Sequence, residues 1–596
     1  MTTDPTLTDP ALRGRAMRAA RGQAPFDLLI ENAQVPDMVT GRIRPADIGL
    51  VGAMIASVHP PDPQRAAQAR LDAQGQFVLP GLIDTHMHVE SSMVSPEDYA
   101  RQVLPRGVTT ALWDPHELAN AAGVAGVEYA CATAAASPMR LLVLAPSCVP
   151  SAPGFEAGGG DFDAFVIARL LARPDIHGLA ELMTMQPLLE GDARVKGIVD
   201  AGLASGKRVC GHARGLTGGD LNAYAAAGVE TDHELTSAAD LLARLEAGMT
   251  VELRGSHEHL LPEFVDALLA LGHLPQTLTL CTDDVFPDDL LARGGLDRLM
   301  RMLISHGLPV EWTWRAATLN AATRIGRPDL GLVAPGRRAD LLIVPDMAQV
   351  RAQAVIVNGQ IVARGDVITG EPAPVPRPAA LGRTVDLAPF TPSDFEVPAR
   401  GPHARIATLS KPRFPQWGER VVDVRDGHLV LPRDMIRMSV SNRYGRATPT
   451  RVALLENWGE WRGAYASTVS HDSHNLTAFG RDPADMAAAA NAVRDMQGGL
   501  AVVEAGRVVA RLALPTAGLM GEGSLAQVAQ QFRALRQCLD GLVTWQPPYL
   551  VFKALFGASL VCNAGPRLSD VGLVDCFGGK VLTTCVLQDG ITGGSR

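Results

Sequence analysis

The stretch GLIDTHMHVESS, residues 81–92, ends an apolar run with two histidines one residue apart. The run has the composition of a buried strand. Side chains at positions i and i+2 of a strand point to the same side, so His86 and His88 are expected to project together while Met87 faces away. Such a pair can chelate a divalent ion; the alternative is two core histidines with ordinary hydrogen bonds.

Further residues of the kinds that bind metals follow the ends of other predicted strands. Glu181, His212 and His233 close three of them, and Asp283 with Asp284 closes a fourth. Carboxylates that are buried together are costly unless a cation compensates them, so this clustering predicts a site for divalent ions. We take Asp283 as the inward residue, although the alternation in TLTLC fixes the inward face only to within one position.

These residues belong to a segment, 81–326, in which short apolar strands alternate with helical stretches rich in Ala and Leu. This rhythm is typical of βα units and a parallel sheet. The strands are expected to end near residues 88, 114, 147, 181, 212, 233, 256 and 284. Eight strands in this span predict an α/β fold, the (β/α)8 TIM barrel, whose active sites form at the carboxyl ends of the strands.

Two β-rich segments flank the predicted barrel. Residues 1–80 contain two runs rich in Val, Leu and Ile, and residues 327–370 contain two more, with Asn358-Gly359 as a hairpin turn. We expect them to form one discontinuous small β-sheet domain. The proline-rich residues 371–384 predict a stiff linker.

Residues 385–596 predict an additional α+β C-terminal domain. A hairpin is expected over 500–514, one helix should begin at Asp482-Pro483, and a capping box of Ser524 and Gln527 should begin another.

Composition excludes several classes of function. A net charge of −9 and a pI near 5.9 provide no basic surface for nucleic acid or anionic lipid, so a small neutral substrate is favoured. No apolar stretch reaches the roughly 18 residues of a membrane span, and the N-terminus lacks the order of a secretory signal, so we expect a cytoplasmic protein. The eight cysteines form no CxxC pair, and no glycine-rich phosphate loop occurs.

The motifs PGLIDTHMH and PGRRADLLIV, with the later histidines and aspartate, resemble the amidohydrolase superfamily over residues 26–365. Longer stretches are similar to the adenine deaminase family within it: HVESSM, WDPHELAN, CGHARGL, TDHE, CTDDVFPDDL and, in the third domain, VSHDSHN. The resemblance therefore covers most of the chain. It implies hydrolysis of adenine to hypoxanthine and ammonia at two divalent transition metal ions, with Mn or Fe favoured and Zn acceptable.

Carried over by position, the resemblance implies a ligand set in which Glu181 bridges the ions. One ion would be held by His86, His88 and Asp283, and the other by His212 and His233. Many members of the superfamily have a carbamylated lysine at the bridge, but no lysine ends the fourth predicted strand here.

Deamination requires water to attack C6 and protons for ring N1 and for ammonia. Asp283 or Asp284 could accept a proton from the attacking hydroxide, and a protonated Glu90 could donate to N1. Asp114, His116 and Glu117, in the loop after the second strand, either cap a helix or serve as catalytic, substrate-binding or additional metal-binding groups.

Two groups remain as candidates for substrate binding. Arg214 and Ser256 follow strand ends, where they bind substrate or pair with loop backbone. HDSHN, residues 471–475, is either a surface turn or a loop over the barrel mouth that brings His471, Asp472 and His474 to the substrate.

Other functions stay open at this point. The same metal set could serve cyclic amide hydrolysis or deacetylation, and a silent scaffold is a further alternative. We expect a homo-oligomer, and take a dimer as its form.

Overall fold

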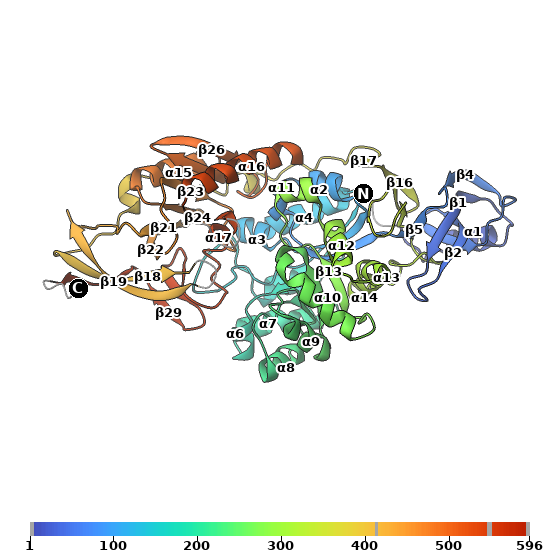
Figure 1. The fold of residues 1–596 in the computed structure, drawn as a ribbon, viewed down its shortest axis with the longest axis horizontal. Helices are drawn as coiled ribbons and strands as arrows, with labels where there is room; N and C mark the ends of the chain where they lie inside the picture. The colour runs from blue at the N-terminus through green and yellow to red at the C-terminus, as the bar shows by residue number, and fades with distance from the viewer. Residues whose placement is uncertain (1–4, 412–414, 545–550, 592–596) are drawn as a thin grey trace.

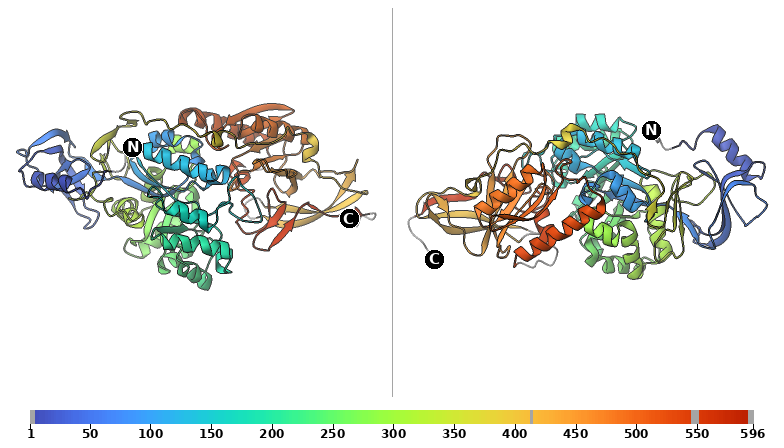
Figure 2. Two further views of the ribbon diagram at one scale, coloured as in Figure 1. Left: turned by 180° about the vertical axis from the view of Figure 1, so that it is seen from behind. Right: turned by 90° about the horizontal axis from the view of Figure 1, so that it is seen from above.

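The computed structural model describes residues 5–411, 415–544 and 551–591. The chain forms three units in a row (Figure 1). A small-sheet unit lies at one end, a unit of parallel strands and helices lies in the middle, and a C-terminal unit lies at the other end. The two further views in Figure 2 show the same order.

The small-sheet unit is one sheet built from strands of both flanking segments. Its order is β17-β16-β15-β14-β5-β1-β2-β3, with β4 paired to β1. The antiparallel pair β5·β14, in which Leu79 lies opposite Leu342, joins the two segments. The Asn358-Gly359 turn has positive φ at both residues, which the predicted hairpin requires. The strands are β1 (Phe26–Pro36), β2 (Ile43–Val51), β3 (Met54–His59), β4 (Ala67–Asp72), β5 (Phe77–Pro80), β14 (Leu341–Val344), β15 (Ala354–Val357), β16 (Gln360–Arg364) and β17 (Val367–Ile368), and helix α1 (Pro10–Ala20) packs against β2 and β3.

The middle unit contains the eight predicted strands. They are β6 (Leu82–Met87), β7 (Val108–Trp113), β8 (Arg140–Val143), β9 (Gly178–Leu182), β10 (Arg208–Gly211), β11 (Thr231–Asp232), β12 (Thr250–Arg254) and β13 (Leu278–Cys281). We call this the eight-strand unit.

Each strand of this unit is linked to the next. Parallel pairing joins β6-β7-β8, β9-β10 and β11-β12-β13. A parallel bridge between Ala145 and Leu179 connects β8 to β9, and Glu230 N donates to Val209 O between β10 and β11. Asp283 N donates to His86 O at 3.0 Å, which connects the last strand to the first. The circuit of strands therefore closes.

Helices follow the strands of this unit. They are α2 (Pro96–Val103), α3 (His116–Ala122), α4 (Val124–Ala136), α5 (Ala164–Leu171), α6 (Met185–Leu189), α7 (Ala193–Ala204), α8 (Gly218–Ala226), α9 (Ala238–Glu246), α10 (Leu261–Ala270), α11 (Pro287–Arg293), α12 (Leu296–Ser305), α13 (Val310–Arg315) and α14 (Ala321–Arg324). Their buried faces pack against the strands; Leu179, Val209 and Ile198 belong to the same core. This packing fixes the strand ends from which the candidate ligands project.

The C-terminal unit is a mixed sheet with helices on it. The sheet order is β20-β19-β18-β22-β21-β24-β23-β25-β26, with β30 paired to β18. Its strands are β18 (His403–Ser410), β19 (Gln416–Arg425), β20 (His428–Leu429), β21 (Met435–Ser441), β22 (Arg451–Glu456), β23 (Gly463–Ser467), β24 (Leu476–Gly480), β25 (Gly499–Glu504), β26 (Arg507–Ala513) and β30 (Val586–Ile591). A separate small sheet contains β27 (Arg567–Leu568), β28 (Leu573–Asp575) and β29 (Lys580–Leu582).

Helices of the C-terminal unit begin where the sequence predicted. Asp482 caps α15 (Pro483–Asp495), and the Ser524–Gln527 capping box begins α16 (Leu525–Leu542). A short helix, α17 (Val551–Phe556), follows. The predicted hairpin is β25·β26.

The proline-rich segment runs over the eight-strand unit. Val375 N donates to Glu97 Oε1, and Ala517 N donates to Leu381 O, so the segment is held at both units. An aromatic cluster of Phe286 with Phe532, Phe552 and Phe556 also joins the two units. Among the described residues, no helix has the length and apolar character that a membrane crossing needs.

Candidate metal centre and its covered cavity

Two histidines of the first strand open the site. His86 lies in β6 and His88 follows its end, and both imidazoles are buried. Their rings meet edge to face at 4.8 Å between centroids, so they do project together as the sequence predicted. Nδ1 of His88 lies 3.0 Å from Asp114 O, a hydrogen bond that turns Nε2 toward the centre of the strands.

Glu181, at the end of β9, lies between two pairs of histidines. Its Oε1 lies 3.5 Å from His86 Nε2 and 3.4 Å from His88 Nε2. Its Oε2 lies 3.8 Å from His212 Nε2 and 3.2 Å from His233 Nε2. Each carboxylate oxygen therefore faces its own imidazole pair, which is the geometry of a bridging ligand.

Asp283 completes the first of these groups. Its Oδ1 lies 3.4 Å from His88 Nε2 and 3.8 Å from His86 Nε2, while Oδ2 forms an ion pair with Arg254. Asp284 points to a different partner, because Ser91 Oγ donates to its Oδ1 at 2.5 Å. The geometry thus distinguishes the two aspartates, which the sequence pattern did not.

The loop after β7 reaches the same centre. Asp114 Oδ1 accepts from His116 N at 3.1 Å, and Oδ2 lies 3.2 Å from His116 Nδ1. His116 Nδ1 also lies 3.5 Å from Glu181 Oε1. Asp114 therefore stabilises the start of α3 and also orients His116. A role at the start of the helix and a role in the site are thus compatible for this residue.

The residues fit divalent ions by the chemistry of their donors. Imidazole and carboxylate ligands converge in groups whose donor atoms lie within 4.8 Å of one another, including His86, His88 and Asp283, and His86, Glu181 and His233. Nε2 of His86 is buried and has no hydrogen-bond partner among the described residues. Such a set of nitrogen and oxygen donors suits Zn, Mn or Fe.

A cavity of about 660 Å³ adjoins this centre. The eight-strand unit supplies one wall, which includes His88, His116, Glu181, His212, Arg214, His233, Glu234, Arg254, Ser256, Asp283 and Asp284. The C-terminal unit supplies the other, which includes His471, Asp472, Lys553, Phe556, Cys562, Asn563 and Arg567. Its size is in the range of sites for small molecules.

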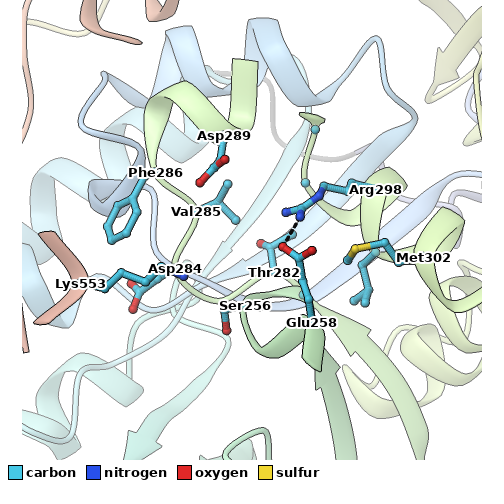
Figure 3. A pocket seen from close by; sticks show the side chains of 14 residues that line it. Ser256, Glu258, Thr282, Asp284, Val285, Phe286, Asp289, Arg298, Met302 and Lys553 are labelled. Atoms are coloured by element: carbon cyan, nitrogen blue, oxygen red, sulfur yellow. Dashed lines mark hydrogen bonds and ion pairs between the residues drawn. The ribbon is translucent and has the colours of Figure 1, made fainter. Parts of the chain in front are cut away.

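A smaller hollow of about 50 Å³ shares Ser256, Asp284, Phe286 and Lys553 with the cavity. Figure 3 shows Lys553, from the C-terminal unit, beside Asp284, with the Arg298–Glu258 ion pair further along the hollow. Burial lowers the pKa of Lys553, while the nearby Asp289 and Asp284 oppose this.

Some predicted site residues do not line the cavity. Glu90 is buried, and its carboxylate accepts from Trp113 Nε1 at 2.9 Å and Leu118 N at 3.3 Å. Glu117 lies behind His471, whose Nε2 is 2.8 Å from Glu117 Oε1. His474 is fully buried, and its Nδ1 faces Ser470 N at 3.2 Å. All three were predicted as catalytic or substrate-binding residues, and none of them is part of the cavity lining.

Sequence reasoning missed several residues of the cavity wall. Arg254 forms ion pairs with Asp283 and Glu234, and Arg214 bonds Glu234 at 2.6 Å. The strand-end rule could have found Glu234 and Arg254, since both stand where predicted strands stop. Lys553 and Arg567 had no such signal, because the fold brings them in from the C-terminal unit.

The pKa values of several acidic and basic groups in the site differ strongly from their usual values. Burial alone would raise the pKa of Glu181, but the facing histidines hold it well below its usual range. Burial and then Asp283 raise the pKa of Asp284. Burial, followed by repulsion from Glu117, raises the pKa of Glu90 to about 8. Burial would lower the pKa of His471, but Asp284 and Glu117 raise it to about 9.

Comparison with known proteins agrees with this arrangement. Residues 77–362 match the amidohydrolase family, and residues 414–579 match the adenine deaminase C-terminal domain. Adenine deaminase 2 of Rhizobium etli is 56% identical over 98% of each chain. The chain belongs to the adenine deaminase family. Adenine deaminases of Klebsiella pneumoniae, at 49% identity over 95% of this chain and 94% of theirs, and of Methylobacterium, at 37% over 94% and 98%, are further relatives.

The two family matches cover the segments that supply both walls of the cavity. The match to the amidohydrolase family contains the histidine groups and Glu181, and the match to the C-terminal domain contains His471 and Arg567.

Proposed function

We infer that this chain hydrolyses adenine to hypoxanthine and ammonia. Water supplies the oxygen that replaces nitrogen at C6, and its two protons end on ring N1 and on the departing ammonia. The observation that carries the assignment is Glu181, whose two oxygens face separate histidine pairs beneath a covered cavity. The names of relatives that align over 98% of the chain support the substrate.

The closed circuit of parallel strands supports a (β/α)8 TIM barrel over residues 81–326. The nine-stranded sheet supports a discontinuous small β-sheet domain, 1–80 with 327–370, and the remaining residues, 385–596, act as the cover. Active sites at the carboxyl ends of barrel strands are the general rule for this fold.

Two divalent ions fit the ligand set. His86, His88 and Asp283 would hold one, His212 and His233 the other, and Glu181 would bridge them. When bound, the ions would lower the pKa of water so that it can attack at neutral pH. The mixed donors accept Zn, Mn or Fe, and we propose Mn or Fe because of the resemblance to adenine deaminases.

We assign the movement of protons to Asp284. It lines the cavity beside the candidate metal ligands, and burial, with Asp283 next to it, raises its pKa, which favours a role in proton transfer. Ser91 engages Oδ1, which leaves Oδ2 to take a proton from the attacking water and to pass it to the substrate.

Glu90 and Glu117 act in this scheme as positioning residues. Glu90 holds the start of α3 through Leu118 N, and Glu117 holds His471 on the cavity wall. His471, His116, Arg214, Ser256 and Asp472 line the cavity and contact the substrate. His474 orients the loop that carries His471.

Incubation of the purified, metal-loaded protein with adenine tests this function. Loss of the adenine absorbance with appearance of hypoxanthine and equimolar ammonia is expected. Turnover of a hydantoin or a dihydropyrimidine without any turnover of adenine would overturn it. We further propose a cytoplasmic homo-oligomer, with a dimer as its form, which light scattering can test.

A further inference from the structure

The C-terminal wall of the cavity contains a buried arginine, Arg567, that forms no ion pair with a carboxylate of the described residues. Arg567 begins β27, its exposure is 4%, and it lines the cavity. Its NH1 group donates to Pro566 O at 3.1 Å. Its Nε has no hydrogen-bond partner, and no carboxylate forms an ion pair with it, among the residues that the structure describes.

Burying a guanidinium without an opposite charge or a full set of hydrogen bonds costs free energy of folding. Removal of a charge from water is compensated in proteins by an opposite charge or by a full set of hydrogen bonds. The other buried arginines of the cavity have such partners, since Arg254 pairs with Glu234 and Asp283. Arg567 differs from Arg254 in this respect, so its donors are available to a ligand in the cavity.

The ligand chemistry follows from the shape of the donor. A guanidinium presents parallel N–H groups in one plane, which match two acceptors on one edge of a planar molecule. Adenine has such an edge at N3 and N9, because both nitrogens are acceptors when the imidazole proton is on N7. A group attached to N9 removes one of these acceptors and fills the space beside it.

The two walls set the orientation of the base. C6 must face the wall that contains Glu181, where the attacking water is activated. N3 is the ring atom directly across the six-membered ring from C6, so the N3/N9 edge faces the wall supplied by the C-terminal unit. Arg567 and the neighbouring Asn563 are polar side chains of that wall.

We propose that Arg567, assisted by Asn563, binds the N3/N9 edge of the purine and thereby makes the site selective for the free base over N9-substituted purines. The proposal rests on the proposed function for the position of C6. Arg567 then determines specificity at the N3/N9 edge, which the wall that contains the candidate metal ligands does not face.

The test is a thermodynamic cycle in which the Arg567 side chain, the N3 atom of the ligand, or both are removed. Dissociation constants of adenine and of 3-deazaadenine, which lacks the N3 acceptor, are measured by calorimetry with metal-loaded proteins that all carry Asp284→Asn to suppress turnover. In this background the protein with an intact Arg567 serves as wild type and is compared with Arg567→Met. A hydrogen bond to a charged group predicts that 3-deazaadenine binds wild type about 10- to 100-fold more weakly than adenine. Arg567→Met should bind both molecules with nearly equal, weakened affinity.

Steady-state kinetics supply a second readout. Arg567→Met should raise KM for adenine about 10- to 100-fold with a much smaller change in kcat, because the contact is remote from C6. Wild type should show little turnover of 9-methyladenine relative to adenine, and Arg567→Met should reduce this preference. Arg567→Lys keeps the charge without the planar fork and should be intermediate.

Arg507→Met is the matched control, because Arg507 is an exposed arginine of the same unit. It should reproduce wild type. An equal penalty for 3-deazaadenine in wild type and in Arg567→Met would overturn the proposal, as would efficient use of 9-methyladenine by wild type. Because binding is measured without turnover, an absence of deamination would contradict the proposed function and leave the result of the binding cycle readable.

Discussion

Nε2 of His471 lies 2.8 Å from Oε1 of Glu117, although 354 residues separate them in the sequence. The contact joins the C-terminal unit to the loop after β7, and both side chains are buried. Burial would raise the pKa of Glu117, but His471 holds it well below its usual range. The pair therefore joins the C-terminal wall of the cavity to the wall that contains the candidate metal ligands.

Replacement of His471 tests this connection. His471→Ala leaves Glu117 buried without its partner, so the free energy of unfolding should fall by about 3 kcal/mol. Adding Glu117→Gln to His471→Ala should cost little more, because the charge that lacked a partner is removed. Denaturant unfolding of the two single variants and the double variant measures the coupling. Additive losses would show that the pair does not act as a unit.

Asp284 is expected to carry protons rather than to bind metal. Asp284→Asn should lower kcat about 10²- to 10⁴-fold, the usual contribution of a positioned acid or base. Metal content should stay at the wild-type level, because Asp284 is not part of the groups around Glu181. Elemental analysis beside the kinetics checks both parts, and a variant that loses its metal together with its activity would contradict this role.

Glu156, in the loop after β8, should make stability depend on pH. Burial, and then Asp472, raise the pKa of this carboxyl from 4.5 to about 8. Between these values the folded state binds more protons than the unfolded state, so stability falls as the pH rises. Glu156→Gln should remove this slope and raise stability at pH 8 by on the order of 3 kcal/mol, with little effect near pH 4.5.

Thermal unfolding from pH 5 to 8 measures the effect. Glu504→Gln is a suitable control, because Glu504 is exposed at the end of β25. Equal shifts of the melting temperature at both ends of the range would contradict the assignment for Glu156.

Local patterns in the sequence predicted the eight strands and the ends at which ligands stand. His86 and His88 obey the alternation of a strand. Glu181 lies near the end of β9, and His212 and His233 directly follow β10 and β11, so short-range periodicity was sufficient to place these residues at strand ends. The sequence could not decide which of Asp283 and Asp284 faces the histidines, because the alternation of a strand fixes the inward face at its end only to within one residue.

The opposite wall of the cavity could not be predicted in this way. Lys553 and Arg567 reach the cavity through long-range packing of the C-terminal unit. The residues next to them in the sequence form no pattern that predicts this position. The hydrogen-bond partners of Glu90 could not be predicted either. Its position near two histidines indicated a catalytic acid, whereas in the structure its carboxylate accepts from Trp113 and Leu118 and is not part of the cavity lining.

The central claim is that the residues around Glu181 would hold divalent ions, which would activate the water that attacks C6 of adenine. The most direct measurement compares hypoxanthine formation by the metal-free protein, the protein reloaded with Mn²⁺, and Glu181→Gln treated in the same way. We expect activity only in the reloaded wild type, with Glu181→Gln at least about 10²- to 10³-fold lower in kcat/KM and poorer in bound metal. Equal activity of the metal-free protein, or full activity of Glu181→Gln, would contradict the claim.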